Sequence, residues 1–254
     1  MAFITKVAAL AIGIPTTLTA IYLLSLHRDV SQHVIAETKL RQSRAGKTLS
    51  SIRKPNCMPT DVADDNSEWI VAYERVTSRP IPVSHLQPAP LSTVLTKYIR
   101  ATMTAFGNTP QVFLLKRMMP KKDLVTAETF SRERIQSLDF EVGDRVHGVW
   151  RVAYRGSGNR EDENAEERQR VELLMEAPGG YRGPVVEGVV VVGVERMDES
   201  RIVFVNETWM WRRPEGKSLM LESAAGRWLH TLLSSWLVKR GVDALFPGRK
   251  EKEA

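Results

Sequence analysis

The stretch from Val185 to Arg213 decides the fold, because it carries two long apolar segments joined by a short polar turn. Residues 185–196 read VVEGVVVVGVER, and residues 201–213 read RIVFVNETWMWRR. Such a density of β-branched and aromatic residues is typical of strands. Because only a short turn around Asp198-Glu199-Ser200 separates the two segments, we expect them to pair as antiparallel neighbours.

Two more strands are predicted before this pair, and a helix is predicted after it. Val146–Arg155 (VHGVWRVAYR) and Arg170–Ala177 (RVELLMEA) are separated by glycine-rich and acidic turn residues. Glu222–Lys239 carries a broad apolar stripe, as expected of a helix that covers a sheet. An antiparallel sheet closed by an amphipathic helix predicts the α+β class.

The region before these four predicted strands contains both helices and strands. The sequence predicts a strand over Trp69–Val76, a helix over Leu91–Phe106, a short strand over Gln111–Lys116 and a weaker helix over Leu124–Leu138.

The order of elements over residues 146–246 resembles the helix-grip fold of the START-like (SRPBCC) superfamily. The resemblance rests on the four strands at 146–155, 170–177, 185–196 and 201–213 and on the closing stretch Gly226-Arg227-Trp228-Leu229-His230. It implies a cavity between helix and sheet, as in the lipid carriers, ligand sensors and polyketide cyclases of that superfamily. The alternative is a cystatin-like α+β cone resembling the SnoaL cyclases, whose helices precede the sheet. The closing helix favours the first.

The N-terminal run Val7–Leu26 contains twenty residues without a charge. As a helix it would be about 30 Å long, which matches the hydrocarbon core of a bilayer. The sequence therefore predicts a single-pass transmembrane anchor over residues 1–28. Basic residues following the run predict a body that faces the cytosol, at the endoplasmic reticulum if the chain is eukaryotic.

Behind the anchor, the sequence predicts a basic and polar linker over residues 29–66, with an amphipathic helix from Val30 to Arg44. The α+β domain is expected over residues 67–248 and a charged tail over 249–254.

The charge distribution argues against nucleic-acid binding. The chain has a net charge of +6, but residues 1–54 hold eight basic and two acidic residues, so the remainder holds 28 of each sign. The excess therefore lies beside the predicted anchor, where lipid headgroups are the expected partner. The single cysteine, Cys57, allows no intramolecular disulfide and fits a reducing compartment.

The sequence contains no G-x-S-x-G, Walker loop, G-x-G-x-x-G after a strand or H-E-x-x-H, and its five histidines are scattered. We therefore expect neither a cofactor nor a metal.

Candidate catalytic residues are polar side chains inside apolar strands. A carboxylate in a dry cavity has a raised pKa and can act as a general acid or base, which nominates Glu187 and Glu207, with His147 or Tyr154 as partner. The alternative is that these residues form solvated cross-strand pairs. The residues expected to line a ligand cavity are Trp150, Arg151, Tyr154, Asn206, Trp209 and Trp211. His230 is interpreted as packing.

Two classes of function follow. The first is a cofactor-independent cyclase, isomerase or dehydratase acting on an apolar polyketide or terpenoid intermediate, because the chain loosely resembles membrane-tethered accessory proteins of fungal natural-product pathways. The second is a membrane-anchored lipid-binding or transfer module, or a scaffold.

Overall fold

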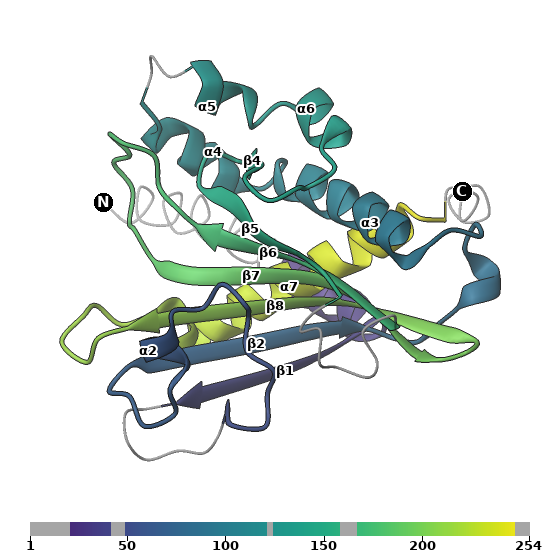
Figure 1. Ribbon diagram of the computed structural model, residues 1–254, viewed down its shortest axis with the longest axis horizontal. Coiled ribbons are helices and arrows are strands. Elements are labelled where there is room, and N and C mark those ends of the chain that lie inside the picture. Colours follow the sequence, from purple (N-terminus) through teal and green to yellow (C-terminus); the bar gives the residue numbers. More distant parts are fainter. Residues whose placement is uncertain (1–20, 42–48, 121–123, 158–166, 247–254) are drawn as a thin grey trace, which may run out of the picture.

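One antiparallel sheet organises the computed structural model, which describes residues 21–41, 49–120, 124–157 and 167–246 (Figure 1). Within these residues the sheet has eight strands, seven of them in the order β1-β2-β8-β7-β6-β5-β4, and β3 pairs with β8 beyond the end of β2. The strands are β1 (Val34–Arg41), β2 (Ile70–Ser78), β3 (Ile81–Pro82), β4 (Arg145–Val146), β5 (Trp150–Gly156), β6 (Arg168–Met175), β7 (Glu187–Asp198) and β8 (Arg201–Arg212).

Helices cover one face of this sheet, which we call the helix face. The long helices α3 (Leu91–Phe106) and α7 (Ala224–Asp243) pack on it and against each other. The shorter helical elements are α2 (Thr60–Ala63), η2 (Val83–His85), α4 (Pro110–Met118), α5 (Leu124–Glu128), α6 (Arg132–Ser137) and η4 (Met220–Glu222), and residues 21–31 are also helical. The sheet and its closing helix thus give the α+β architecture expected from the sequence.

The opposite face, which we call the segment face, is covered by residues 49–69. Leu49, Met58 and Val62 of this segment pack on Trp209 and Trp211 of β8. The buried carboxylate of Glu172 on β6 holds the segment in place, because it accepts hydrogen bonds from the backbone N–H groups of Asn56 and Cys57, each 2.9 Å long.

Residues 29–66, expected as a linker, therefore contribute to the sheet and to its core. Val34–Arg41 pairs along its whole length with β2, from Val34 opposite Ser78 to Arg41 opposite Val71. The amphipathic helix expected over Val30–Arg44 is wrong at this point, because β2 offers an unpaired edge whose hydrogen bonds a strand can satisfy.

The predicted transmembrane anchor is wrong for the part of the chain that the structure describes. Residues 7–20 of the expected span lie outside the described residues, and no described helix is long and apolar enough to cross a membrane. The end of the expected span lies in the helix over residues 21–31, where Leu23 and Leu26 line a cavity beside α7. This finding overturns the transmembrane element of the expected fold. It also overturns the single-pass topology and the location at the endoplasmic reticulum, which were inferred from that element.

Three shorter elements also differ from expectation. Gln111–Lys116 lies inside helix α4 rather than in a strand, because Pro110 occupies the first helical turn, a position that favours helix initiation. The helix expected over 124–138 is two helices, since the side chain of Ser131 accepts the backbone N–H of Arg134 and begins α6. The strand expected from residue 146 is interrupted by positive φ angles at His147 and Gly148.

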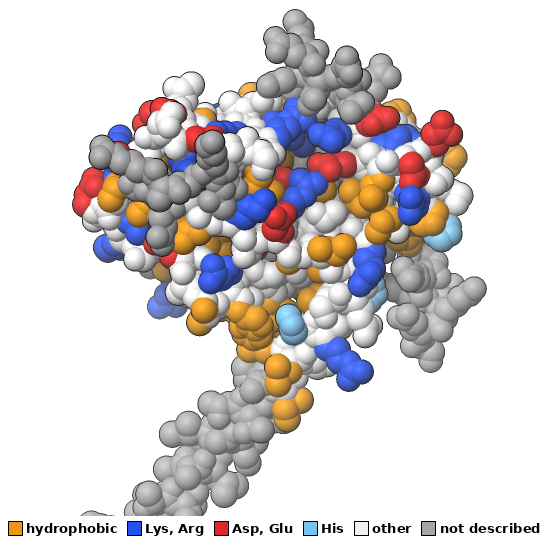
Figure 2. All heavy atoms as spheres, turned by 90° about the horizontal axis from the view of Figure 1, so that it is seen from below, with side chains coloured by type: hydrophobic (Ala, Val, Ile, Leu, Met, Phe, Trp, Pro, Cys, Tyr) orange, Lys and Arg blue, Asp and Glu red, His pale blue; other side chains and the backbone are white. Residues whose placement is uncertain are grey.

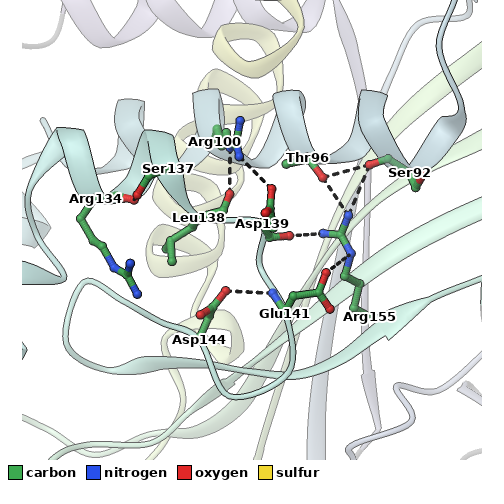
Figure 3. Close-up of polar contacts among 10 residues, drawn as sticks. All are labelled: Ser92, Thr96, Arg100, Arg134, Ser137, Leu138, Asp139, Glu141, Asp144 and Arg155. Atoms are coloured by element: carbon green, nitrogen blue, oxygen red, sulfur yellow. Dashed lines mark hydrogen bonds and ion pairs between the residues drawn. The ribbon is translucent and has the colours of Figure 1, made fainter.

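An arginine on β5 ties helix α3 to the sheet (Figure 3). The guanidinium of Arg155 donates to Thr96 Oγ1 at 2.8 Å and to the carbonyl oxygen of Asp139, and it forms an ion pair with Glu141. Arg100 on α3 donates to the carbonyl oxygen of Leu138 at 2.8 Å and to Asp139 Oδ1 at 2.9 Å. The loop after α6 is thereby fixed between α3 and β5.

Helices α3 and α7 approach closely at Gly241. The sequence suggests that this glycine ends or bends the last helix, but α7 continues through it to Asp243. A Cβ at this position would lie 2.4 Å from Thr102 Oγ1 and 2.5 Å from Tyr98 Cε2. The glycine therefore serves the crossing of the two helices.

We predict that Gly241→Ala lowers the free energy of unfolding by about 1–3 kcal/mol, because overpacking at the helix crossing outweighs the better helix propensity of alanine. Urea unfolding of the variant measures this. Gly179→Ala is the control, since a Cβ there meets nothing within 4 Å. Equal stability of the two variants would contradict this account.

Candidate active site

A buried carboxylate on the helix face forms the centre of the candidate site. Glu74 lies in the middle of β2, and strand alternation directs its side chain toward α7, where it is 1% exposed. Its Oε1 lies 2.7 Å from His230 Nδ1, and its Oε2 accepts a hydrogen bond from Thr231 Oγ1. Ser234 Oγ lies 3.3 Å from the same ring nitrogen. Position 234 lies on the same face of α7 as positions 230 and 231, because it follows them by four and three residues.

These contacts keep Glu74 ionised. Burial raises the pKa of the Glu74 carboxyl, but the hydrogen bonds from His230, Thr231 and Ser234, together with the charge of His230, outweigh it, so that the net pKa lies below its usual range. An ionised carboxylate only accepts hydrogen bonds, so His230 donates from Nδ1. When the ring is neutral, its lone pair lies on Nε2, a tautomer that we infer from the hydrogen-bond network.

His230 lies where two apolar cavities meet. One, of about 290 Å³, is lined mainly by apolar side chains that include Trp150, Met175 and Met210. The other, of about 420 Å³, lies between α7 and residues 22–26. His230, Gln111 and Met220 line both, so the imidazole and one amide are placed at the junction of the two apolar spaces.

Hydrophobic side chains also gather around the second cavity on the surface. Figure 2 shows them where the N-terminal helix joins the body. Tyr22 is 64% exposed and Leu24 63% exposed, and Trp228 and Leu229 on α7 are also exposed. The rings of His27 and Trp228 lie 6.2 Å apart, which brings residues 21–31 against the start of α7.

The arrangement is that of a carboxylate-oriented histidine. Glu74 fixes the ring and would stabilise its protonated form, which suits His230 to general base and acid catalysis at Nε2. A serine-protease-type triad does not fit, because Ser234 approaches Nδ1, on the side of Glu74, rather than Nε2. Among the described residues, no group of three or more His, Cys, Asp or Glu side chains is placed to hold a metal ion.

The structure does not bring the predicted catalytic residues together. Glu187 is exposed at the beginning of β7. Glu207 lies on the segment face, where it accepts hydrogen bonds from Tyr73, Arg75 and Trp209. The contacts of these two side chains and those of His147 have no residue in common, so the predicted acid–base pair is not formed.

His147 is a buried residue of the core. It is 0% exposed, its Nε2 lies 2.9 Å from the carbonyl oxygen of Met103, and its ring packs near Phe106 and Phe130. Its Nδ1 is buried without a hydrogen-bond partner among the described residues. Burial therefore lowers the pKa of His147 to about 4, because a second proton would have no acceptor.

The predicted ligand-binding residues are divided among several environments. Trp150 lines the first apolar cavity. Trp209 is also among the residues that border this cavity, but its side chain packs with that of Trp211 in the core of the segment face. The remaining three lie elsewhere: Arg151 pairs with Glu176 at 2.6 Å, Tyr154 stacks beside the guanidinium of Arg170, and Asn206 accepts a hydrogen bond of 3.0 Å from the hydroxyl of Tyr98.

Sequence reasoning missed Glu74 and His230 for identifiable reasons. The segment WIVAYERV contains Glu74 as a charged residue inside a predicted strand. This pattern would indicate Glu74 as a site residue only if it were known which positions of the strand face the helices. His230 lies within the apolar stripe of the last helix, where a histidine is usually a packing residue. Only the pairing of β2 with α7 joins the two side chains.

Comparisons with protein-family models, with curated proteins and with solved structures found no match for this chain.

We predict that stability falls as the pH decreases through the interval between the pKa values of His147 in the unfolded and folded chain, 6.5 and about 4. In this interval the unfolded state binds the extra proton, so stability is complete above pH 6.5 and declines below it. Between pH 7 and pH 5 this histidine accounts for a loss of about 2 kcal/mol.

Urea unfolding at both pH values measures this difference, and His147→Asn should reduce it, because asparagine does not titrate and tolerates a positive φ. His85→Asn, at an exposed position, is the control. If the free energy of unfolding of His147→Asn depended on pH as much as that of the wild type, the prediction would be wrong.

Proposed function

We propose that the protein is a cofactor-independent acid–base enzyme of the isomerase, cyclase or dehydratase type, acting on an apolar small molecule. The observation that supports this most strongly is the position of His230, held by the buried carboxylate of Glu74 at the junction of two apolar cavities. The proposal keeps the reaction class suggested by the sequence and assigns it to different residues.

In this proposal His230 Nε2 removes a proton from a carbon or hydroxyl of the substrate. The proton stays on the imidazolium, which Glu74 stabilises from the other side of the ring, and it is returned at another atom of the same molecule. The reaction is therefore redox-neutral and needs no co-reactant. The amide of Gln111, which lines both cavities, is placed to donate a hydrogen bond to an oxygen on which negative charge develops.

The cavities suit a substrate with few polar groups. The first is bounded by Trp150, Met175, Val190 and Met210 among others, and these side chains would exclude water from the reacting atoms. A dry surrounding also strengthens the interaction between Glu74 and the imidazolium formed during the reaction.

A carrier of apolar small molecules is the second candidate function. The exposed Tyr22, Leu24 and Leu229 beside the second cavity favour it, because a patch of this kind allows an apolar ligand to enter without crossing a polar rim.

Proton transfer can be tested before the substrate is known. We predict that the full chain, incubated in D₂O with a metabolite extract of the host, introduces deuterium into at least one apolar metabolite, detected as a mass shift. His230→Gln should reduce the rate of exchange by about 10²- to 10⁴-fold, since the base is removed. His85→Gln, a histidine outside the site, should exchange as the wild type does.

Glu74→Gln tests the positioning role separately. The amide no longer requires a donor at Nδ1, so ¹⁵N spectra of the ring should show the Nδ1–H tautomer in the wild type and a changed tautomer population in the variant, together with slower exchange. An apolar ligand that binds equally to wild type and His230→Gln, without deuterium incorporation in either, would refute the enzyme and favour the carrier.

A further inference from the structure

A polar hollow lies on the segment face, on the other side of the sheet from His230. Its volume is about 140 Å³, and its lining includes the charged side chains Arg53, Arg75, Arg168, Arg170, Glu195 and Glu207. Strand register brings these positions together: Arg170 lies opposite Gly193, Arg168 opposite Glu195, and Glu207 opposite Arg75.

Gly193 creates the room for this hollow. It faces the cavity between Val191 and Glu195 on β7, where any larger side chain would project into the space. A Cβ on Gly193 would meet only Gln169 O at 3.4 Å and Arg170 Cβ at 3.6 Å, so the backbone itself does not demand glycine.

The carboxylates around the hollow are already engaged. Arg75 forms ion pairs with both Glu195 and Glu207, and Glu207 also accepts hydrogen bonds from Tyr73 and Trp209. Glu172, beneath Arg170, accepts two backbone hydrogen bonds from the covering segment. Among the described residues, four arginines thus surround three carboxylates.

Arg170 carries the donors that point to a ligand. Its side chain is 11% exposed, and its Nη2 forms an ion pair with Glu172 Oε1 at 2.8 Å. Nevertheless Nε and Nη2 are buried without a hydrogen bond among the described residues. These two nitrogens form one edge of the guanidinium, and the carboxylate of Glu172 already lies against Nη2. Nε is therefore the buried donor that has no partner among the described residues, and an oxyanion that accepts from it would recover the free energy of the missing hydrogen bond.

We propose that this hollow binds a single oxyanion group, with a phosphoryl group as its preferred ligand. Arg170 contributes Nε as a donor together with its charge, Arg168 and Arg53 line the hollow, and Gly193 provides the space. The small volume limits the bound part to one such group, which comes either as a free inorganic anion or as the end of a larger phosphate monoester.

Isothermal titration calorimetry of the full chain tests the proposal, with inorganic phosphate and glycerol 3-phosphate each titrated against sodium chloride of equal ionic strength. We expect saturable binding of at least one. Tighter binding of inorganic phosphate identifies a free anion as the ligand type, and tighter binding of the monoester identifies a larger molecule. Binding of neither beyond the chloride control overturns the proposal.

Arg168→Gln should weaken the binding about tenfold or more, because it removes a charged donor. Arg196→Gln, the same change of charge outside the hollow, should bind as the wild type does. Gly193→Val keeps every charge and fills the space, so it should abolish binding. This variant tests the site independently of Arg168→Gln, in case the latter fails to fold. Unchanged affinity in Gly193→Val shows that phosphate binds elsewhere and refutes the site.

Discussion

The structure depends on one constraint, which is that strand β7 must be buried on both sides. Its valines alternate between the two faces of the sheet, with Val190, Val192 and Val194 on the helix face and Val189 and Val191 on the segment face. A strand that is apolar on both faces requires two covering layers. Helices α3 and α7 provide one layer and residues 49–69 provide the other, so the segment before the central strands is as necessary to the fold as the closing helix.

Because both faces of the sheet are covered, each side has a buried interior. Each interior contains a buried carboxylate, and the two carboxylates differ in the group that compensates their negative charge. Glu207 is paired with the guanidinium of Arg75, which compensates its burial in a fixed ion pair. The described hydrogen-bond partners of Glu74 are a histidine and the hydroxyl groups of Thr231 and Ser234. A carboxylate paired with arginine has a permanent counterion, whereas one paired with histidine can exchange a proton with its surroundings. This difference is the physical reason why we propose acid–base chemistry on the helix face.

The sequence was sufficient for the elements whose pattern is strong and whose partners are neighbours in the chain. The meander of β5 to β8 and the helix Leu91–Phe106 follow from periodicity and turn residues. β1 could not be found in this way, because its pairing with β2 joins residues 30 to 44 positions apart and half of its residues are polar. The apolar run at Gln111–Lys116 is too short for periodicity to distinguish strand from helix. The N-terminal run was assigned from hydropathy alone, and hydropathy does not show that Leu23 and Leu26 have a protein surface to pack against.

The site was harder to predict than the fold, since its residues come together only through tertiary packing. The sequence indicated that charged side chains interrupt apolar strands, but it could not say which face each one occupies. A shift of one residue in strand register moves every side chain to the other face of the sheet. Such a shift would exchange the surroundings of Glu74 with those of Arg75, or those of Asn206 with those of Glu207. Trp150 at the beginning of β5 lines the cavity, but the side chain of Trp209 on β8 packs on the segment face, an assignment that alternation along β8 decides and the sequence leaves open.

The alternation of β2 has a last consequence, because Glu74 and Arg75 are consecutive residues that face opposite layers. The carboxylate that holds the imidazole and the guanidinium beside the oxyanion hollow share one peptide unit, and a displacement of that unit changes both surroundings at once. If either ligand shifts β2, the two binding equilibria become thermodynamically linked, and the factor by which one ligand alters the affinity of the other is the same in both directions. A single strand would then transmit information across the sheet without any movement of the layers that cover it.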